Sequence, residues 1–190
     1  KINIIFLDID RVLNGNSPVR YIIKKIFKFF HLEKLSALIF NEDIYSIHKN
    51  NIRKLAVICK YTKAKIVLTS SWRDRVKNAY FNGIDKYQLA NLTSYYFKKY
   101  NIPLIDITEH SPDGRRDKEI ITWLAKNERI VNKYIILDDE YQDLEIFKSN
   151  LILTSDSNIH RKIQGRWYCR EGLRWKHVIK AIDKLGINYF

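Results

Sequence analysis

The sequence predicts an α/β fold built on one parallel sheet. Short apolar runs rich in β-branched residues alternate with longer segments whose apolar residues recur at helical spacing. Such alternation is typical of parallel strands with helices on both faces of the sheet. Two of the apolar runs end in paired aspartates, and the carboxyl ends of parallel strands are where open α/β sheets place their active sites.

The expected elements follow from these patterns. Strands are predicted near residues 2–7, 65–69, 104–107, 133–137 and 151–154. Helices are predicted near residues 43–61, 87–99, 117–127 and 174–185. With 190 residues, 46% of them hydrophobic, the chain has enough material for one core, so we expect a single domain over residues 1–190.

The first apolar run, Ile2 to Leu7, stops in the sequence Asp8-Ile9-Asp10. Strand alternation points the side chains of Asp8 and Asp10 the same way. Two carboxylates placed in this way can hold one hard cation such as Mg²⁺. The alternative is a pair of solvated loop carboxylates.

The second run, Lys65 to Leu68, ends in the hydroxyl residues Thr69, Ser70 and Ser71, followed by Trp72 and Arg73. Hydroxyl groups at a strand end can donate to phosphate oxygens, and so can the backbone N–H groups of the helix that would follow. The alternative is that Ser70 or Ser71 caps that helix.

The fourth run, which ends at Leu137, is followed by Asp138 and Asp139, with Asp143 a little further on. Clustered like charges repel one another unless a cation joins them. A second strand that ends in carboxylates therefore strengthens the prediction of a metal site at this edge of the sheet.

The helix expected at 117–127 begins in a basic segment that contains Arg115, Arg116 and Lys118. Basic residues oppose the helix dipole at this end, which prefers negative charge. This local conflict favours another use for the cations, such as pairing with a carboxylate or a phosphate. A solvated basic turn is the alternative.

Taken in order, the segments DIDRVL, VLTSSWR, the basic helix start and ILDDEYQD resemble the four motifs of the haloacid dehalogenase (HAD) superfamily of phosphohydrolases. More narrowly, the chain resembles small HAD domains found alone or in RNA-repair proteins, with patterns such as DIDGVLN, VxSSSWR, RxxEIxxWL and ILDD. The resemblance runs from Ile2 to about Ser155. It implies a HAD-like Rossmannoid three-layer sandwich with strand order 5-4-1-2-3.

The resemblance also implies roles for the strand-end residues. Asp8 matches the nucleophile that accepts the phosphoryl group, and Asp10 matches the general acid and base. Thr69 is the best match for the phosphate-binding hydroxyl, with Ser70 second. Ser71 and Arg73 are further candidates for binding the substrate.

The basic and acidic motifs complete the implied site. Arg116 matches the cation that neutralises the transferring phosphoryl group, with Lys118 as the alternative. Asp139 matches the direct metal ligand, supported by Asp138 and Asp143. Mg²⁺ would then be held by the Asp8 side chain, the Asp10 backbone carbonyl and Asp139.

One position departs from the family pattern, which usually has Gly after the second aspartate where this chain has Arg11. Gly permits a turn that Arg permits less well. Arg11 either adds a phosphate contact or marks reduced turnover.

Composition bears on partners and location. Lys and Arg total 34 against 21 Asp and Glu, and a net charge of +13 favours polyanionic partners such as nucleotides, RNA or DNA ends. The alternative is genomic base composition. Only Cys59 and Cys169 are present, which favours a reducing cytoplasm. No 18-residue apolar stretch and no secretory signal is evident, so we expect no membrane span.

Two segments look like additions to the core. Residues 16–41 have apolar positions at helical spacing with basic residues between them, and we expect a small helical lid after the first strand. The alternatives are a packed surface helix or a helix lying on a membrane. Residues 158–175 interleave basic and aromatic side chains, either to bind nucleic acid or as core anchors; the candidates are Arg161, Lys162, Arg166, Trp167 and Arg170.

The function expected from the whole sequence is a Mg²⁺-dependent phosphatase that acts through an aspartyl-phosphate. Its expected substrate is a nucleotide or a phosphorylated nucleic-acid end. Two alternatives stay open: a module of the same fold that binds phosphorylated nucleic acid without turnover, and a phosphatase of small metabolites. The sequence makes no prediction of the oligomeric state.

Overall fold

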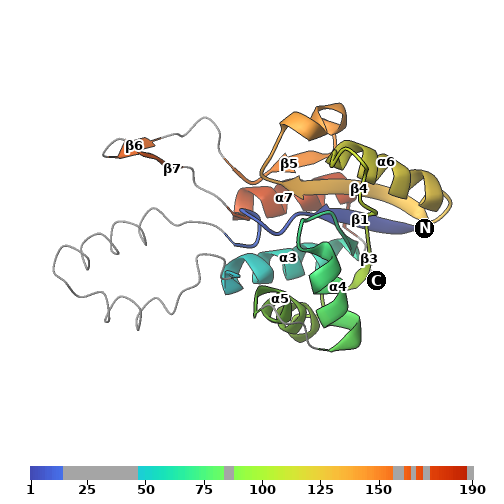
Figure 1. The fold of residues 1–190 in the computed structure, drawn as a ribbon, viewed down its shortest axis with the longest axis horizontal. Helices are drawn as coiled ribbons and strands as arrows, with labels where there is room; N and C mark the ends of the chain where they lie inside the picture. Colours follow the sequence, from blue (N-terminus) through green and yellow to red (C-terminus); the bar gives the residue numbers. More distant parts are fainter. Residues whose placement is uncertain (15–46, 84–87, 156–160, 164–165, 169–171, 188–190) are drawn as a thin grey trace.

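The computed structural model describes residues 1–14, 47–83, 88–155, 161–163, 166–168 and 172–187. Its centre is a sheet of five parallel strands in the order β3-β2-β1-β4-β5 (Figure 1). The strands are β1 (Ile2–Leu7), β2 (Lys65–Leu68), β3 (Leu104–Ile107), β4 (Val131–Asp138) and β5 (Leu151–Leu153). This is the expected order 5-4-1-2-3 counted from the other edge.

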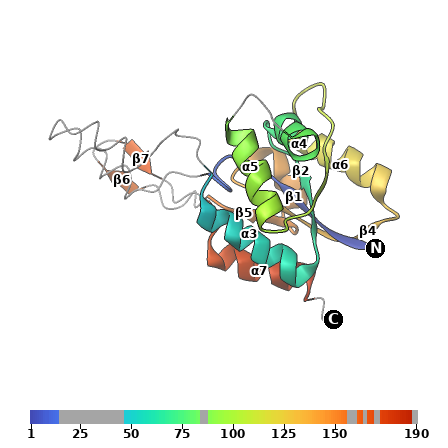
Figure 2. The same ribbon diagram turned by 90° about the horizontal axis from the view of Figure 1, so that it is seen from below.

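Helices cover both faces of the sheet (Figures 1 and 2). They are α3 (Lys49–Thr62), α4 (Arg73–Asn82), α5 (Gln88–Lys99), α6 (Arg116–Asn127), α7 (Trp175–Leu185) and the 3₁₀ helix η1 (Gln142–Phe147). The three-layer α/β sandwich predicted from the sequence is therefore confirmed.

The side chains of the central strand β1 alternate between two buried apolar clusters. Ile5 and Leu7 belong to the cluster that contains residues of α3, α4, α5 and α7. Ile4 and Phe6 belong to the cluster that contains residues of α6 and η1. Because a strand alternates its side chains with a period of two, the next even-numbered residue, Asp8, emerges on the α6 side of the sheet.

The structure differs from the expected elements in a few places. Among the described residues, the first helix begins at Lys49, and residues 43–46 of the expected range lie outside them. Helix α4 was anticipated after the hydroxyl residues but not delimited, because it buries only Arg73, Val76 and Ala79 and so has a weak apolar period. Strand β4 is longer than expected and includes Asp138.

The segment after β5 contains two short strands that the sequence did not predict. β6 (Arg161–Ile163) and β7 (Arg166–Tyr168) pair antiparallel and form a separate two-stranded sheet. Figure 1 shows this pair beyond the carboxyl ends of the five central strands. Strands of only three residues that mix basic and apolar side chains give little periodic signal.

Three further expectations concern Cys59, the lid and a membrane span. Cys59 is buried in the core, and burial raises the pKa of its thiol to about 12. The lid predicted at 16–41 lies outside the described residues. Among the helices that the structure describes, none has the length and apolar character needed to cross a membrane.

Candidate active site

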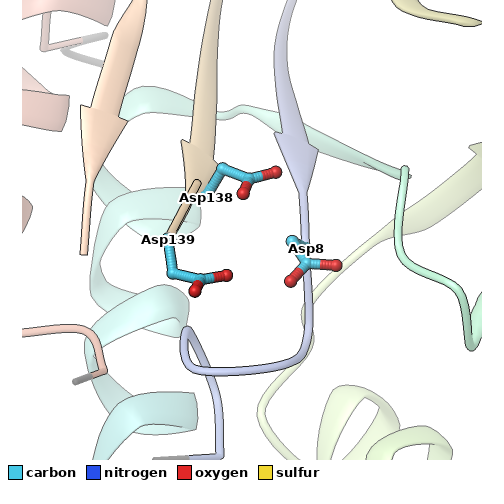
Figure 3. Close-up of side chains that lie close together, drawn as sticks. All are labelled: Asp8, Asp138 and Asp139. Atoms are coloured by element: carbon cyan, nitrogen blue, oxygen red, sulfur yellow. The ribbon is translucent and has the colours of Figure 1, made fainter. Parts of the chain in front are cut away.

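Three aspartates meet where β1 and β4 end (Figure 3). Asp8, Asp138 and Asp139 each offer a carboxylate oxygen, and these oxygens lie within 4.8 Å of one another. Asp8 and Asp138 are buried, with exposed fractions of 3% and 0%. Parallel pairing places the ends of β1 and β4 side by side, so residues 130 positions apart in sequence form one cluster.

Burial raises the pKa of all three carboxylates, and the negative charge of Asp138 adds to this for Asp8 and Asp139. Burial, with the nearby charge of Asp138, raises the pKa of Asp8 to about 7. Burial and the charge of Asp138 also raise the pKa of Asp139 to about 6. The pKa of Asp138 itself is raised by burial, an effect that Arg116 opposes.

The cluster suits a hard divalent cation. Its donors are carboxylate oxygens, which Mg²⁺ prefers. Ionised carboxylates are costly to bury, and burial raises the pKa values of Asp8 and Asp139 although Arg116 and Arg11 lie beside them. A cation placed among the three groups would remove this cost, so the residues fit the metal that the sequence predicted.

Two of the expected metal-site residues keep their carboxylates outside the cluster, although Asp10 was expected to bind the metal through its backbone carbonyl. The Asp10 carboxylate accepts hydrogen bonds from Trp72 Nε1 at 3.2 Å and from Asn14 Nδ2 at 2.9 Å, so it is held beside the cluster but not within it. Asp143 is exposed on η1 and lies outside the three-carboxylate group. The resemblance gave Asp143 a supporting role, but Asp143 lies near the start of η1, on the exposed side of that 3₁₀ helix.

Arg116 is the cation that faces Asp8 and Asp138. It is the first residue of α6, and its guanidinium lies 2.5 Å from Asp138 Oδ2 and 3.6 Å from Asp8 Oδ1. The alternative residue, Lys118, is exposed and pairs with Asp113 instead. Of the basic residues at this helix start, Arg116 therefore resolves its conflict with the helix dipole by pairing with the buried carboxylates.

The hydroxyl segment after β2 separates into three environments. Thr69 is fully buried, and its Oγ1 has no hydrogen-bond partner within the described part of the chain. Ser70 accepts a hydrogen bond from the Trp72 N–H at 3.3 Å, which is a local turn contact, and Ser71 is exposed. A buried unpaired hydroxyl is costly, so Thr69 is the residue of the three that a ligand oxygen would satisfy.

Arg73 was expected to bind substrate, but the structure shows it buried in an internal network. Its Nη2 lies 2.8 Å from Glu119 Oε1, and its Nη1 donates to the carbonyl oxygens of Thr69 and Ser70. Glu119 lies on α6, one turn after Arg116. The ion pair therefore ties the hydroxyl segment to the helix that carries the active-site arginine.

Sequence reasoning did not single out Glu119 as a site residue. The signal was present, because Glu119 is the acidic residue in the RxxEI pattern and sits next to apolar positions of an amphipathic helix. An acidic residue on the buried side of a helix requires a cation as partner. That partner, Arg73, lies 46 positions earlier, and only the fold brings the two together.

Arg11, the residue that replaces the usual Gly, takes a backbone conformation that favours Gly. Its φ is +53°, in the left-handed region. Its Nη1 donates to Asp139 Oδ2 at 3.2 Å, and its side chain is 58% exposed. Arg11 therefore places a positive charge beside the aspartate cluster without closing it off.

The residues that flank the two added segments, 16–41 and 158–175, lie at the carboxyl edge of the sheet. Asn14, the last described residue before 15–46, donates to Asp10, and the His48 N–H donates to the Leu13 carbonyl at 3.0 Å. Ser155 Oγ donates to the Asp139 carbonyl at 2.6 Å, and the Gly172 N–H donates to the Arg11 carbonyl at 2.8 Å.

Gly172 is required at this return point. Its φ is +95°, and a Cβ there would lie 2.7 Å from Asn51 Nδ2. The predicted binding residues Arg161, Arg166 and Trp167 belong to β6 and β7, whose side chains lie outside the description, as does Arg170. The two anchors of the segment nevertheless fix its ends beside the aspartates.

The arrangement has the parts that phosphoryl transfer needs. The buried carboxylate of Asp8 belongs to the aspartate cluster and faces the guanidinium of Arg116, and the carboxylate of Asp10 is held nearby. Positioning and electrostatic stabilisation supply most of the catalysis in reactions of this class.

The comparisons with known proteins agree with this geometry. Residues 4–158 match the family model described as "HAD domain in Swiss Army Knife RNA repair proteins". The matched range contains β1 from Ile4 onward, all of β2 through β5 and every site residue placed above except those of the β6–β7 segment and Gly172. Searches of curated proteins and of solved structures gave no match.

Proposed function

The chain belongs to the family of HAD domains in Swiss Army Knife RNA repair proteins, and on this premise we propose that it is a Mg²⁺-dependent phosphatase acting through an aspartyl-phosphate. Membership supports a phosphohydrolase of the HAD type. The metal, the covalent intermediate and the substrate are our proposal. The observation that carries it is the meeting of Asp8 with Asp138, Asp139 and Arg116 at one sheet edge.

In the proposed first step, an Asp8 carboxylate oxygen attacks the phosphorus atom of a phosphomonoester. The bond between phosphorus and the leaving oxygen breaks, and Asp10 gives that oxygen a proton. Trp72 and Asn14 hold the Asp10 carboxylate in place for this transfer. The product is an acyl phosphate on Asp8 and a free alcohol.

In the second step, water replaces Asp8 on phosphorus. Asp10, now ionised, accepts a proton from that water, and inorganic phosphate leaves as the Asp8 carboxylate is restored. Arg116 and the Thr69 hydroxyl bind the phosphoryl oxygens throughout. Mg²⁺, held by Asp8, Asp139 and the Asp10 carbonyl with support from Asp138, would neutralise charge on the attacking carboxylate and the phosphoryl group.

We propose a nucleotide or a phosphorylated nucleic-acid end as substrate. The net charge of +13 favours polyanions, and the family name places related domains in RNA repair proteins. The basic and aromatic segment 158–175 is anchored at Ser155 and Gly172, next to Asp139 and Arg11. A substrate that leaves the site on this side would meet that segment.

The decisive experiment is a phosphate-release screen with the purified protein and Mg²⁺. Substrates are nucleotides, sugar phosphates, a generic aryl phosphate and oligonucleotides carrying a 5′- or 3′-phosphate. We expect release that disappears with chelator, returns with Mg²⁺ and is abolished in Asp8→Asn, whose amide cannot act as nucleophile. Full turnover by Asp8→Asn would refute the mechanism.

A second function, binding of phosphorylated nucleic acid without turnover, is favoured by one observation. Arg11 contributes a cation to Asp139, the proposed metal ligand, where the family pattern has Gly. The same screen separates the two functions. A binding module would hold a phosphorylated oligonucleotide more tightly than its dephosphorylated form and release no phosphate, whereas preferred turnover of sugar phosphates would identify a small-metabolite enzyme.

A further inference from the structure

We propose that a basic groove at the amino-end edge of the sheet binds the backbone of a single-stranded nucleic acid. The groove is a hollow of about 720 Å³ between the last turns of α3, the start of β2 and the chain that joins α5 to β3. Its lining combines cations with aliphatic and aromatic surface: Arg53, Ala56, Val57, Lys60, Lys63 and Tyr100 are its main side chains. We call it the α3 groove.

The α3 groove carries concentrated positive charge. Arg53, Lys60, Lys63 and Lys65 all line it, and none of its lining residues, all within the described part of the chain, is acidic. The sequence explains this, because residues 44–73 and 86–105 contain no Asp or Glu. Positive charge unrelieved by acids on the surrounding elements favours a polyanion.

The basic side chains extend along α3 toward the active site. Lys49, Arg53 and Lys60 are separated by four and seven residues, so they share one helix face. From Lys49 to Lys60 the helix rises about 16 Å. The helix begins beside the catalytic loop, where the His48 N–H bonds to the Leu13 carbonyl. The stripe therefore runs from the catalytic edge to the opposite edge.

Aromatic groups accompany the cations. Tyr100 lines the groove and accepts a hydrogen bond from Arg53 Nε at 3.3 Å. Its ring stacks on Tyr96, with centroids 6.3 Å apart and planes inclined by 27°. Tyr61, beside Lys60 on α3, is half exposed. Aromatic rings next to a basic groove are how proteins hold single strands without reading sequence.

The shape and composition favour a nucleic acid over a membrane. A bilayer surface is broad and contacts protruding side chains, whereas the α3 groove is a hollow between elements. Its size and its mixture of cations and an aromatic ring suit a chain of phosphates and bases. The groove and the catalytic edge lie at opposite ends of β2, about 13 Å apart. The groove would therefore hold a part of the nucleic acid that is remote from its reacting end.

The test measures binding without any reactive phosphate. Fluorescence anisotropy follows a labelled 16-nucleotide single strand, RNA or DNA, with hydroxyl groups at both ends, over a range of salt concentrations. The variant is Arg53→Gln with Lys60→Gln. The matched control is Lys77→Gln with Lys148→Gln, which removes the same charge from exposed lysines outside the groove.

We expect the groove variant to bind about tenfold more weakly at low salt and to lose about 1.4 from the slope of log affinity against log salt, the value for two phosphate contacts. The control should match the wild type. Equal losses in both variants would mean that only net charge matters, and no loss in either would also overturn the proposal.

Two further arms distinguish other partners and the proposed chemistry. Vesicles containing phosphatidylserine should not show a loss specific to the groove variant; if they do and the oligonucleotide does not, the groove is a lipid surface and the proposal fails. Hydrolysis of a small aryl phosphate should be unchanged in both variants. Asp8→Asn should bind the oligonucleotide normally, so the groove and the phosphatase can fail independently.

Discussion

The guanidinium of Arg73 lies 2.8 Å from the carboxylate of Glu119, and both side chains are 4% exposed. Arg73 follows β2, and Glu119 lies on α6, on the side of the sheet toward which Asp8 points. Through this pair, the segment that holds Thr69 and the helix that begins with Arg116 have a fixed relation. The pair is a positioning device under the proposed active site.

Breaking this ion pair should be strongly destabilising. Glu119→Leu leaves the buried Arg73 charge without its carboxylate partner, and we expect a loss of about 3–5 kcal/mol in the free energy of unfolding. Arg73→Met combined with Glu119→Leu removes both charges and should recover much of that loss. Urea unfolding of Arg73→Met, Glu119→Leu and the double variant gives the coupling free energy between the two side chains. Strict additivity of the two single losses would contradict a direct interaction.

Arg116 and Lys118 form a matched pair of substitutions on one helix turn. Arg116→Gln should lower kcat/KM by about 10²–10³, because Arg116 contacts Asp8 and Asp138 and faces the phosphoryl position. Lys118→Gln should change it less than about threefold, since Lys118 is exposed and pairs with Asp113. Steady-state kinetics of both variants on one substrate shows which of the two basic residues acts in catalysis. Equal losses of kcat/KM in the two variants would show that Lys118 also acts in the active site.

Thr69→Val should separate stability from activity. The Thr69 hydroxyl is buried and has no partner within the described chain, so its removal should leave stability unchanged or raise it by up to about 1 kcal/mol. If the hydroxyl binds phosphate, kcat/KM should fall by about 10². Ser71→Ala, at an exposed position, is the control. A Thr69→Val enzyme with full activity would remove the hydroxyl from the mechanism.

Arg11→Gly should tighten metal binding. The change removes a positive charge 3.2 Å from Asp139 and places Gly at a φ of +53°, which Gly adopts readily. We expect Mg²⁺ to bind on the order of tenfold more tightly by isothermal titration calorimetry at fixed ionic strength. Arg11→Lys keeps the charge and should bind Mg²⁺ as the wild type does. An unchanged affinity in Arg11→Gly would show that Arg11 does not compete with the metal.

Without metal, the aspartate cluster should make the protein less stable as pH rises. Burial and Asp138 raise the pKa of Asp8 from 3.8 to about 7, so between these values the folded state holds a proton that the unfolded state has lost. The stabilisation from Asp8 is complete below pH 3.8 and is lost as pH rises through about 7.

Thermal unfolding in chelator at pH 5 and pH 8 measures this effect. The midpoint of the wild type should fall relative to that of Asp8→Asn, which lacks the titrating group, and Mg²⁺ should restore the wild type at pH 8. An unchanged difference between the wild type and Asp8→Asn from pH 5 to pH 8 in chelator would show that Asp8 is already ionised in the folded state without a metal.

Most of the architecture followed from local patterns. The apolar runs ending at Leu7 and Leu137 marked the central strands, and the helical periods of α5, α6 and α7 located those helices within one residue. The weakly periodic α4 and the short strands β6 and β7 were not delimited, because few of their positions are both apolar and regularly spaced.

The sequence by itself determined which residue types reach the carboxyl edge of the sheet. All strands of a parallel sheet end at that edge, so a residue that follows a predicted strand directly must lie there. Asp8, Thr69 and Asp138 were found in this way. Only the tertiary structure decided between neighbours in the chain: it turned Arg116 toward the aspartates, left Lys118 and Asp143 exposed, and buried Arg73 against Glu119. Which side chain faces the aspartates depends on distances in space between groups on different elements. The separation of two residues along the chain does not give those distances.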